Sequence, residues 1–167
     1  MARESRSVAR VVAALVATTW LIGIAPVLLG GRTPASEPHL ASSLPWFDRM
    51  AGAIGGGHLP EWDDASGLGA PVALEVGRPL CYPPAWLVGA LPRPWGTDAL
   101  LVAHLLLFGL GAAAWSRRLG AEPMGAVVAG GGAALSAAAL GVVVGGGAIC
   151  AAAWLPWVGW AVDRLAA

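Results

Sequence analysis

The sequence predicts an all-α membrane protein that crosses the bilayer several times. Of its 167 residues, 57% are hydrophobic and 12% are charged, and its mean hydropathy is +0.68. A soluble domain usually carries about a quarter charged residues. Long uncharged runs alternate with short charged segments along the chain. We therefore expect a single membrane domain with about four transmembrane helices, at 11–30, 98–116, 123–144 and 149–163, and a long outer loop at 31–96.

The first predicted span is the uncharged run 11–30. About 20 helical residues are enough to cross a hydrocarbon core of roughly 30 Å. Arg3, Arg6 and Arg10 precede the run and favour a cytoplasmic amino terminus. A cleaved signal peptide is the competing interpretation, but its apolar region is usually only about 7–15 residues long. We therefore favour a retained transmembrane helix.

The outer loop contains a predicted amphipathic helix at 44–54. Its apolar residues recur at helical spacing on one side, while Asp48 and Arg49 fall on the other. The run 55–57 is all glycine and ends the helix. Two interpretations remain open. The helix lies on the membrane surface with its apolar face down, or it packs on the rest of the loop.

The second predicted span, 98–116, begins after a candidate N-cap at Thr97 and is followed at once by Arg117 and Arg118. These arginines mark a cytoplasmic end, so this helix runs from outside to inside. His104 is ionisable and lies in the interior of the span, which makes it a candidate functional residue. We favour a neutral histidine that is hydrogen-bonded to a neighbouring helix.

The last two predicted spans differ in composition. The segment 123–144 is rich in alanine and glycine, and its small residues at 130–132 suit close helix packing. The segment 149–163 contains Pro156, which should kink it, and several tryptophans that form an interfacial belt or pack in the core. Because the sequence stops shortly after this segment, we expect a fragment, or a truncated gene product, of a longer polytopic protein.

Charge and cysteine content exclude several classes of function. The formal net charge is zero and no basic tract occurs, so a nucleic acid is not an expected partner. Cys81 and Cys150 are too few and too far apart for a disulfide framework or a zinc site. The glycine runs lie in apolar segments, which does not fit a phosphate-binding loop between a strand and a helix.

A series of short motifs follows in a distinctive order. They are Gly57-His58-Leu59-Pro60-Glu61-Trp62, Gly67-Leu68-Gly69-Ala70-Pro71, Tyr82-Pro83-Pro84, Arg117-Arg118-Leu119-Gly120 and Ala153-Trp154-Leu155-Pro156-Trp157. In their order and spacing, the chain resembles the N-terminal part of the bacterial YfhO-like membrane proteins, which belong to the wider group of GT-C-type glycosyltransferases. The resemblance extends from about residue 44 to residue 165 and implies a partial GT-C-like fold in the bacterial inner membrane.

The resemblance implies that a sugar moves from a polyprenyl-phosphate carrier to a cell-envelope acceptor on the outer face. In such enzymes an acidic residue in the first outer loop acts on the acceptor. Glu37 takes the place of the family's aspartate, and Asp48 is the second candidate. A carboxylate there would accept a proton from the acceptor hydroxyl. The implied partners are the lipid bilayer, the carrier-linked sugar and the acceptor.

Further loop residues are candidates for substrate binding. Trp62 and Tyr82 would stack on a sugar or pin the loop to the scaffold. Asp63 and Asp64 would hold a divalent cation or form a plain turn. Arg78 would meet a phosphate or pair with Glu75, and His58 would assist acid–base chemistry or have no such role. Apart from this cation, no cofactor is expected. The competing function is a non-catalytic membrane protein: an inactive relative, a scaffold, or a lipid-handling or transport component.

Overall fold

The computed structural model describes residues 29, 44–64, 68–72, 82–91, 95–136 and 148–166. The predicted span 11–30 (Leu29 apart), Glu37 and Arg78 lie outside the described residues. The described part is mostly helical and contains one short antiparallel sheet. Its elements are α2 (Leu44–Gly55), β1 (Trp62–Asp63), β2 (Ala70–Pro71), α3 (Pro83–Ala90), α4 (Trp95–Arg118), α5 (Pro123–Leu135), α7 (Ala148–Ala152) and α8 (Leu155–Leu165).

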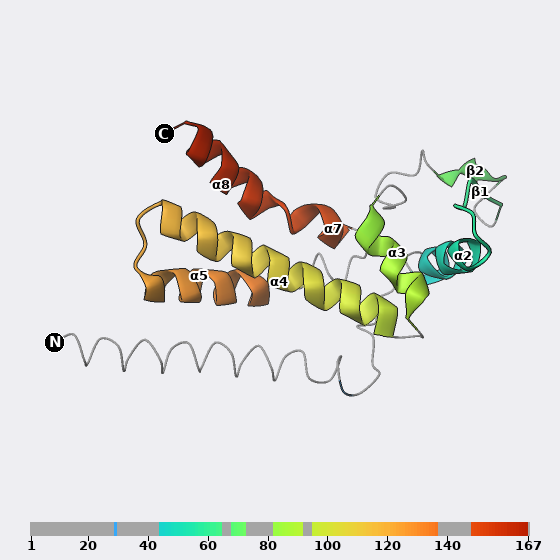
Figure 1. The fold of residues 1–167 in the computed structure, drawn as a ribbon, viewed down its shortest axis with the longest axis horizontal. Helices are drawn as coiled ribbons and strands as arrows, with labels where there is room; N and C mark the ends of the chain where they lie inside the picture. Colours follow the sequence, from blue (N-terminus) through green and yellow to red (C-terminus); the bar gives the residue numbers. More distant parts are fainter. Residues whose placement is uncertain are drawn as a thin grey trace.

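The long helix α4 lies at the centre, with α5 along one side and α8 along the other (Figure 1). We call α4, α5, α7 and α8 the bundle. Helix α3 packs on α4 and on α2, so that α2, α3 and the β1–β2 hairpin gather at the amino-terminal end of α4 (Figure 1). We call these three elements the cap. The described chain is thus an elongated helical bundle with a small mixed unit at one end.

Helix α2 has the extent that its sequence predicts. Its apolar side is buried: Met50 is 0% exposed, Trp46 4% and Phe47 6%, and they share one core with Val72, α3 and α7. Of the two interpretations of this helix, packing on the rest of the loop is therefore the one observed. The helix ends where Gly57 takes a positive φ of 77° and the His58 amide donates to the Ala53 carbonyl, a Schellman-type termination.

Helix α4 contains the predicted span 98–116 and extends it at both ends. Among the described residues it is the one helix that is long and apolar enough to cross a membrane. Only 28% of the most apolar 18-residue stretch of α4 is buried. Leu106 and Leu110 on this helix are exposed. Large apolar residues are exposed on α5 and α8 as well: Val127, Val128, Leu155, Val158, Val162 and Leu165.

Helices α4 and α5 meet backbone to backbone. A Cβ atom built on Gly109 would lie 2.8 Å from the Gly130 carbonyl oxygen, and one on Gly130 would lie 2.7 Å from the Gly109 carbonyl oxygen. Only glycine allows this approach, which resembles the small-residue packing of membrane helices. The prediction of close packing through the glycine run at 130–132 is confirmed at Gly130.

Two predicted spans need correction. The predicted helix 123–144 ends at Leu135, because Ser136 is extended and its amide turns back to the Ala133 carbonyl. The predicted helix 149–163 is divided into α7 and α8 at Ala153 and Trp154. Pro156 has no amide hydrogen to continue the ladder across this junction, so the expected kink is a break between two helices. The described helices therefore do not support four full-length spans.

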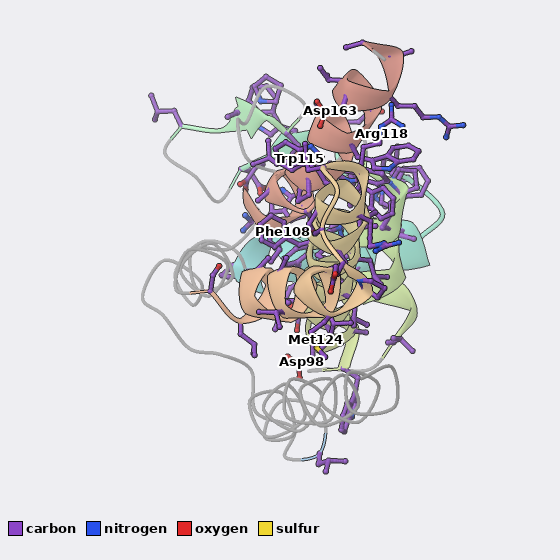
Figure 2. All side chains as sticks on the ribbon, turned by 90° about the vertical axis from the view of Figure 1, so that its left-hand side faces the viewer. Asp98, Phe108, Trp115, Arg118, Met124 and Asp163 are labelled. Carbon is purple, nitrogen blue, oxygen red and sulfur yellow. The ribbon has the colours of Figure 1, made fainter. Side chains whose placement is uncertain are left out.

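Helix α8 runs in the same direction as α4 and is fastened to it twice. The Trp157 indole lies where a side chain on Gly111 would stand, and its Nε1 donates to the Leu107 carbonyl at 2.9 Å. Near the carboxyl ends, Trp115 donates to the Asp163 carboxylate and Arg118 donates to the Asp163 carbonyl (Figure 2). The charged ends of α4 and α8 are therefore at the same level of the bundle.

Candidate functional site

A partly buried ion pair fastens the hairpin to α2. Asp63 on β1 is 1% exposed, and its Oδ2 lies 2.9 Å from Nη2 of Arg49 on α2. Strand residues alternate between faces, so Asp63 points inward while its neighbour Trp62 points outward. On the partner strand Pro71 pairs with Trp62, and the next residue, Val72, is buried in the core. The hairpin is thereby fixed on both of its strands.

The outward face of the hairpin carries the exposed Trp62, which is 60% accessible. Its indole edge lies against Gly69: a Cβ atom there would be 2.5 Å from Nε1 and 2.9 Å from Cε2 and Cζ2. Gly69 also has a φ of 91°, a conformation that favours glycine. The adjacent acids Glu61 and Asp64 are exposed, and so is His58 at the end of α2. A rigid aromatic ring is thus presented among polar side chains.

Tyr82 belongs to a separate, inner cluster. Its hydroxyl lies 2.8 Å from Nε2 of His104 on α4 and accepts a hydrogen bond from Trp154 Nε1 at 3.1 Å. Nδ1 of His104 lies 2.6 Å from the Leu100 carbonyl oxygen. His104 is 3% exposed, and Tyr82 is half-buried at the start of α3. The cluster therefore joins α3, α4 and the junction of α7 and α8.

The hydrogen-bond partners define the form of His104. A carbonyl oxygen can only accept, so Nδ1 must carry the hydrogen. With a hydrogen on Nδ1 alone, Nε2 accepts from the Tyr82 hydroxyl, whose oxygen accepts from Trp154. The Tyr82 hydroxyl, both ring nitrogens of His104 and the Trp154 indole nitrogen therefore all have hydrogen-bond partners. His104 is the buried member of this network, while Trp154 at its other end is exposed.

The remaining predicted site residues do not converge on one point. Asp48 is half-buried on α2, whereas Asp64 is exposed beyond β1. Asp63 and Asp64 point to different sides of the chain, and no group of three metal-ligating side chains occurs within the described ranges. The hairpin collects Trp62, Asp63 and Asp64, while Tyr82 lies in the inner cluster.

Sequence reasoning did not anticipate the partners Arg49 and Trp154. Arg49 lies fourteen residues before Asp63 and on another element, so no helical or strand periodicity joins them. The hairpin itself was not predicted, because the sequence indicates an all-α fold with an irregular loop here, and two-residue strands give no readable alternation. No protein-family model, no curated protein and no solved structure matches the chain.

Proposed function

We propose that this protein is embedded in the bacterial inner membrane and serves glycosyl transfer on the outer face, either as a glycosyltransferase or as the N-terminal part of one. The observation that carries the membrane placement is the distribution of tryptophan and charge along α4. The resemblance to the YfhO-like proteins supplies the reaction class.

The exposed tryptophans of α4 match the dimensions of a bilayer. Trp95 is 41% exposed and Trp115 is 36% exposed. They are twenty residues apart, which is about 30 Å along an α-helix, and the hydrocarbon core is about 30 Å thick. The ionisable residues between them, Asp98 and His104, are both buried. The exposed surface of α4 between two aromatic levels is therefore uncharged, as expected for contact with lipid.

The ends of the bundle support one orientation. Arg117 and Arg118 end α4, and Arg164 lies in the last turn of α8 at the same level. Arginines concentrate on the cytoplasmic side of membrane proteins. The cap then lies on the outer face, level with the amino-terminal end of α4. We propose that α5 and the α7–α8 pair lie beside α4 within the membrane.

The membrane placement can be tested with spin labels. In a background with Cys81 and Cys150 replaced, a label at Leu110→Cys on α4 is expected to collide with oxygen but not with a water-soluble nickel chelate. A label at Leu68→Cys on the hairpin is the matched control, because both leucines are well exposed at 62% and 105%. The control should show the reverse accessibility. Nickel accessibility at both positions would contradict membrane embedding.

On the outer face, the proposed reaction is transfer from a polyprenyl-phosphate sugar. The acceptor oxygen bonds to the anomeric carbon as the bond from that carbon to the phosphate oxygen breaks, and polyprenyl phosphate leaves. A carboxylate removes the proton from the acceptor hydroxyl. Glu37 and Asp48 are the proposed carboxylates. Asp48 has the right setting for this role, because it lies on the cap, at the end of the bundle assigned to the outer face.

The reaction class can be tested in the organism that encodes the protein. After deletion, the full-length gene is restored as wild type, Glu37→Gln or Asp48→Asn, and the envelope glycans are compared by mass spectrometry. Glu122→Gln is the matched control, since this exposed residue precedes α5 at the other end of the bundle. Loss of a glycan in one acid variant and not in the control supports the proposal. Unchanged envelope glycans in both acid variants would contradict the proposed glycosyl transfer.

The competing function is a non-catalytic membrane protein. It is favoured by the partners of Asp63 and Tyr82: the first is buried against Arg49 and the second is bonded within the inner cluster. Both contacts join elements together. Under this alternative, deletion of the gene would change the amount or location of a partner protein or lipid and leave every glycan intact.

A further inference from the structure

The outward face of the hairpin combines an exposed aromatic ring with a rigid support. Trp62 is 60% exposed, although a bulky aromatic side chain normally gains by burial. Its position is not that of a freely moving surface residue. The ring edge is propped against Gly69, the next residue is buried against Arg49, and the residue after its cross-strand partner is buried in the core. The indole is therefore held in place before any ligand arrives.

A held ring of this kind suits a flat ligand with C–H groups on one side. The negative face of an indole attracts polarised C–H bonds, and one face of a pyranose ring presents a row of them. Hydroxyl groups at the edge of the same sugar need acceptors, and carboxylates are strong acceptors. Asp64, which is exposed and two residues after Trp62, falls on the same side of the chain as the indole and can supply one. Preorganisation removes the entropic cost of ordering Trp62 on binding.

Charge decides between a sugar and the bilayer surface as the occupant. Exposed apolar residues near Trp62, such as Leu59 and Leu68, would also suit membrane insertion. However, inserting the hairpin would carry Glu61 and Asp64 toward anionic headgroups and out of water, which is unfavourable for carboxylates. An uncharged saccharide in water involves neither cost. The acids also disfavour an anionic sugar.

We propose that the β1–β2 hairpin is a saccharide-binding platform, in which the Trp62 indole stacks on a neutral pyranose and Asp64 accepts a hydrogen bond from one of its hydroxyls. This inference rests on the proposed function, because it names the side chain that meets a sugar on the outer face. It concerns binding and assigns no part of the transfer step to Trp62.

The test is binding of neutral sugars to the full-length protein in nanodiscs. The protein is labelled with 5-fluorotryptophan, and the Trp62 resonance is identified by its loss in Trp62→Phe. Methyl glycosides of glucose, galactose, mannose and N-acetylglucosamine, and their disaccharides, serve as probes. We expect at least one to shift the Trp62 resonance. Trp62→Ala should weaken its binding about ten-fold or more.

A second variant separates position from chemistry. Gly69→Ala keeps the indole but places a Cβ atom 2.5 Å from its Nε1, so the ring must move. We expect sugar affinity to fall as in Trp62→Ala. Trp95→Ala, which removes an exposed tryptophan from α4, is the control and should bind normally. If Trp62→Ala binds sugar normally, or if none of the sugars shifts the Trp62 resonance, the platform is refuted. Membrane insertion would instead make brominated lipids, and no sugar, perturb that resonance.

The two proposals can fail separately. In one outcome, sugar binding depends on Trp62 but glycans are unchanged in the Glu37 and Asp48 variants. This result would support the platform and refute the transferase. Loss of glycans in those variants, with sugar binding indifferent to Trp62, would refute the platform alone.

Discussion

The cap and the bundle are built on opposite principles. In the cap, the large side chains on the inner side of α2 are buried: Trp46, Phe47 and Met50 are between 0% and 6% exposed. The bundle turns its large side chains outward, with Leu110 at 62% and Val158 at 56%, and it places glycine between its helices. The cap is organised like a small soluble domain and the bundle like a piece of membrane protein.

This difference in packing indicates which interactions stabilise the cap and which stabilise the bundle. The hydrophobic effect drives apolar side chains of the cap into a common core, to which α4 and α7 contribute Leu100, Leu105, Ile149 and Cys150. In the membrane placement that we propose, lipid would give no such driving force between helices, and close backbone contact and hydrogen bonds from tryptophan indoles would hold the bundle together. The Trp157 bond to the Leu107 carbonyl and the Gly109–Gly130 approach are examples. Substitutions can test whether the two regions respond as this contrast requires.

The largest effect is expected in the cap. Met50→Ala removes a side chain that is 0% exposed, and a large-to-small change in a packed core costs about 2–5 kcal/mol. The measurement is thermal or denaturant unfolding in detergent, followed by circular dichroism. Gly52→Ala on the same helix is the control, because no atom lies within 4 Å of its new Cβ. It should stabilise α2 by up to about 1 kcal/mol. If Met50→Ala left the free energy of unfolding unchanged, α2 would not depend on this core.

In the bundle the opposite change, small to large, should be the damaging one. Gly130→Leu places a side chain against the Gly109 carbonyl and Ala113 Cβ, at 2.7 Å and 3.0 Å for the first atom. We expect a loss of about 3 kcal/mol, the upper part of the range for overpacking, and a wider distance distribution between spin labels on α4 and α5. Gly132→Leu, which has open space around it, should do neither. Equal effects of the two variants would contradict backbone contact at Gly130.

The inner cluster should respond with an intermediate loss. Tyr82→Phe removes the hydroxyl that joins His104 and Trp154. Leaving a buried polar atom without its partner costs about 1–3 kcal/mol. Combining it with His104→Leu should restore part of the loss, since both partners are then apolar. Nitrogen NMR of the wild type should show hydrogen on Nδ1 of His104 and none on Nε2. Hydrogen on Nε2 would contradict the assigned tautomer.

The smallest effect is expected at the charged end of the bundle. Trp115→Phe removes the hydrogen bond from the exposed indole to the carboxylate of the half-buried Asp163. Exposed polar contacts contribute little, so the loss in stability should be no more than about 1 kcal/mol in the same unfolding experiment. A loss of stability as large as that of Tyr82→Phe would show that the Trp115–Asp163 contact is withdrawn from water, as the inner cluster around His104 is.

Local patterns in the sequence predicted some elements well. The helical spacing and the glycines after it predicted α2, and the apolar run between Asp98 and Arg117 predicted α4. Both signals lie within a single element. By contrast, the predicted helix 123–144 ended early at Leu135, since alanine and glycine continue through the segment and give no visible stop.

The candidate site was less predictable, because its contacts join distant parts of the chain. His104 attracted attention as an ionisable residue in a span, but its partner Tyr82 lies twenty-two residues earlier, on another helix. Asp63 and Asp64 are adjacent in sequence and suggested a shared role. The strand sends them to different surroundings, one buried and one exposed. Periodicity assigns a face to each residue but does not identify its partner on another element.

The hydrogen bonds of Tyr82 imply an order of assembly during synthesis. His104 follows Tyr82 by twenty-two residues, whereas Trp154 follows it by seventy-two. The ribosome delivers the chain from its amino end, so the first bond can form while Trp154 has yet to be made. The indole then closes a contact that already exists, and α7 and α8 dock on a surface whose earlier parts are in place. The docking of α7 and α8 would thereby stabilise the contact between α3 and α4 after it has formed.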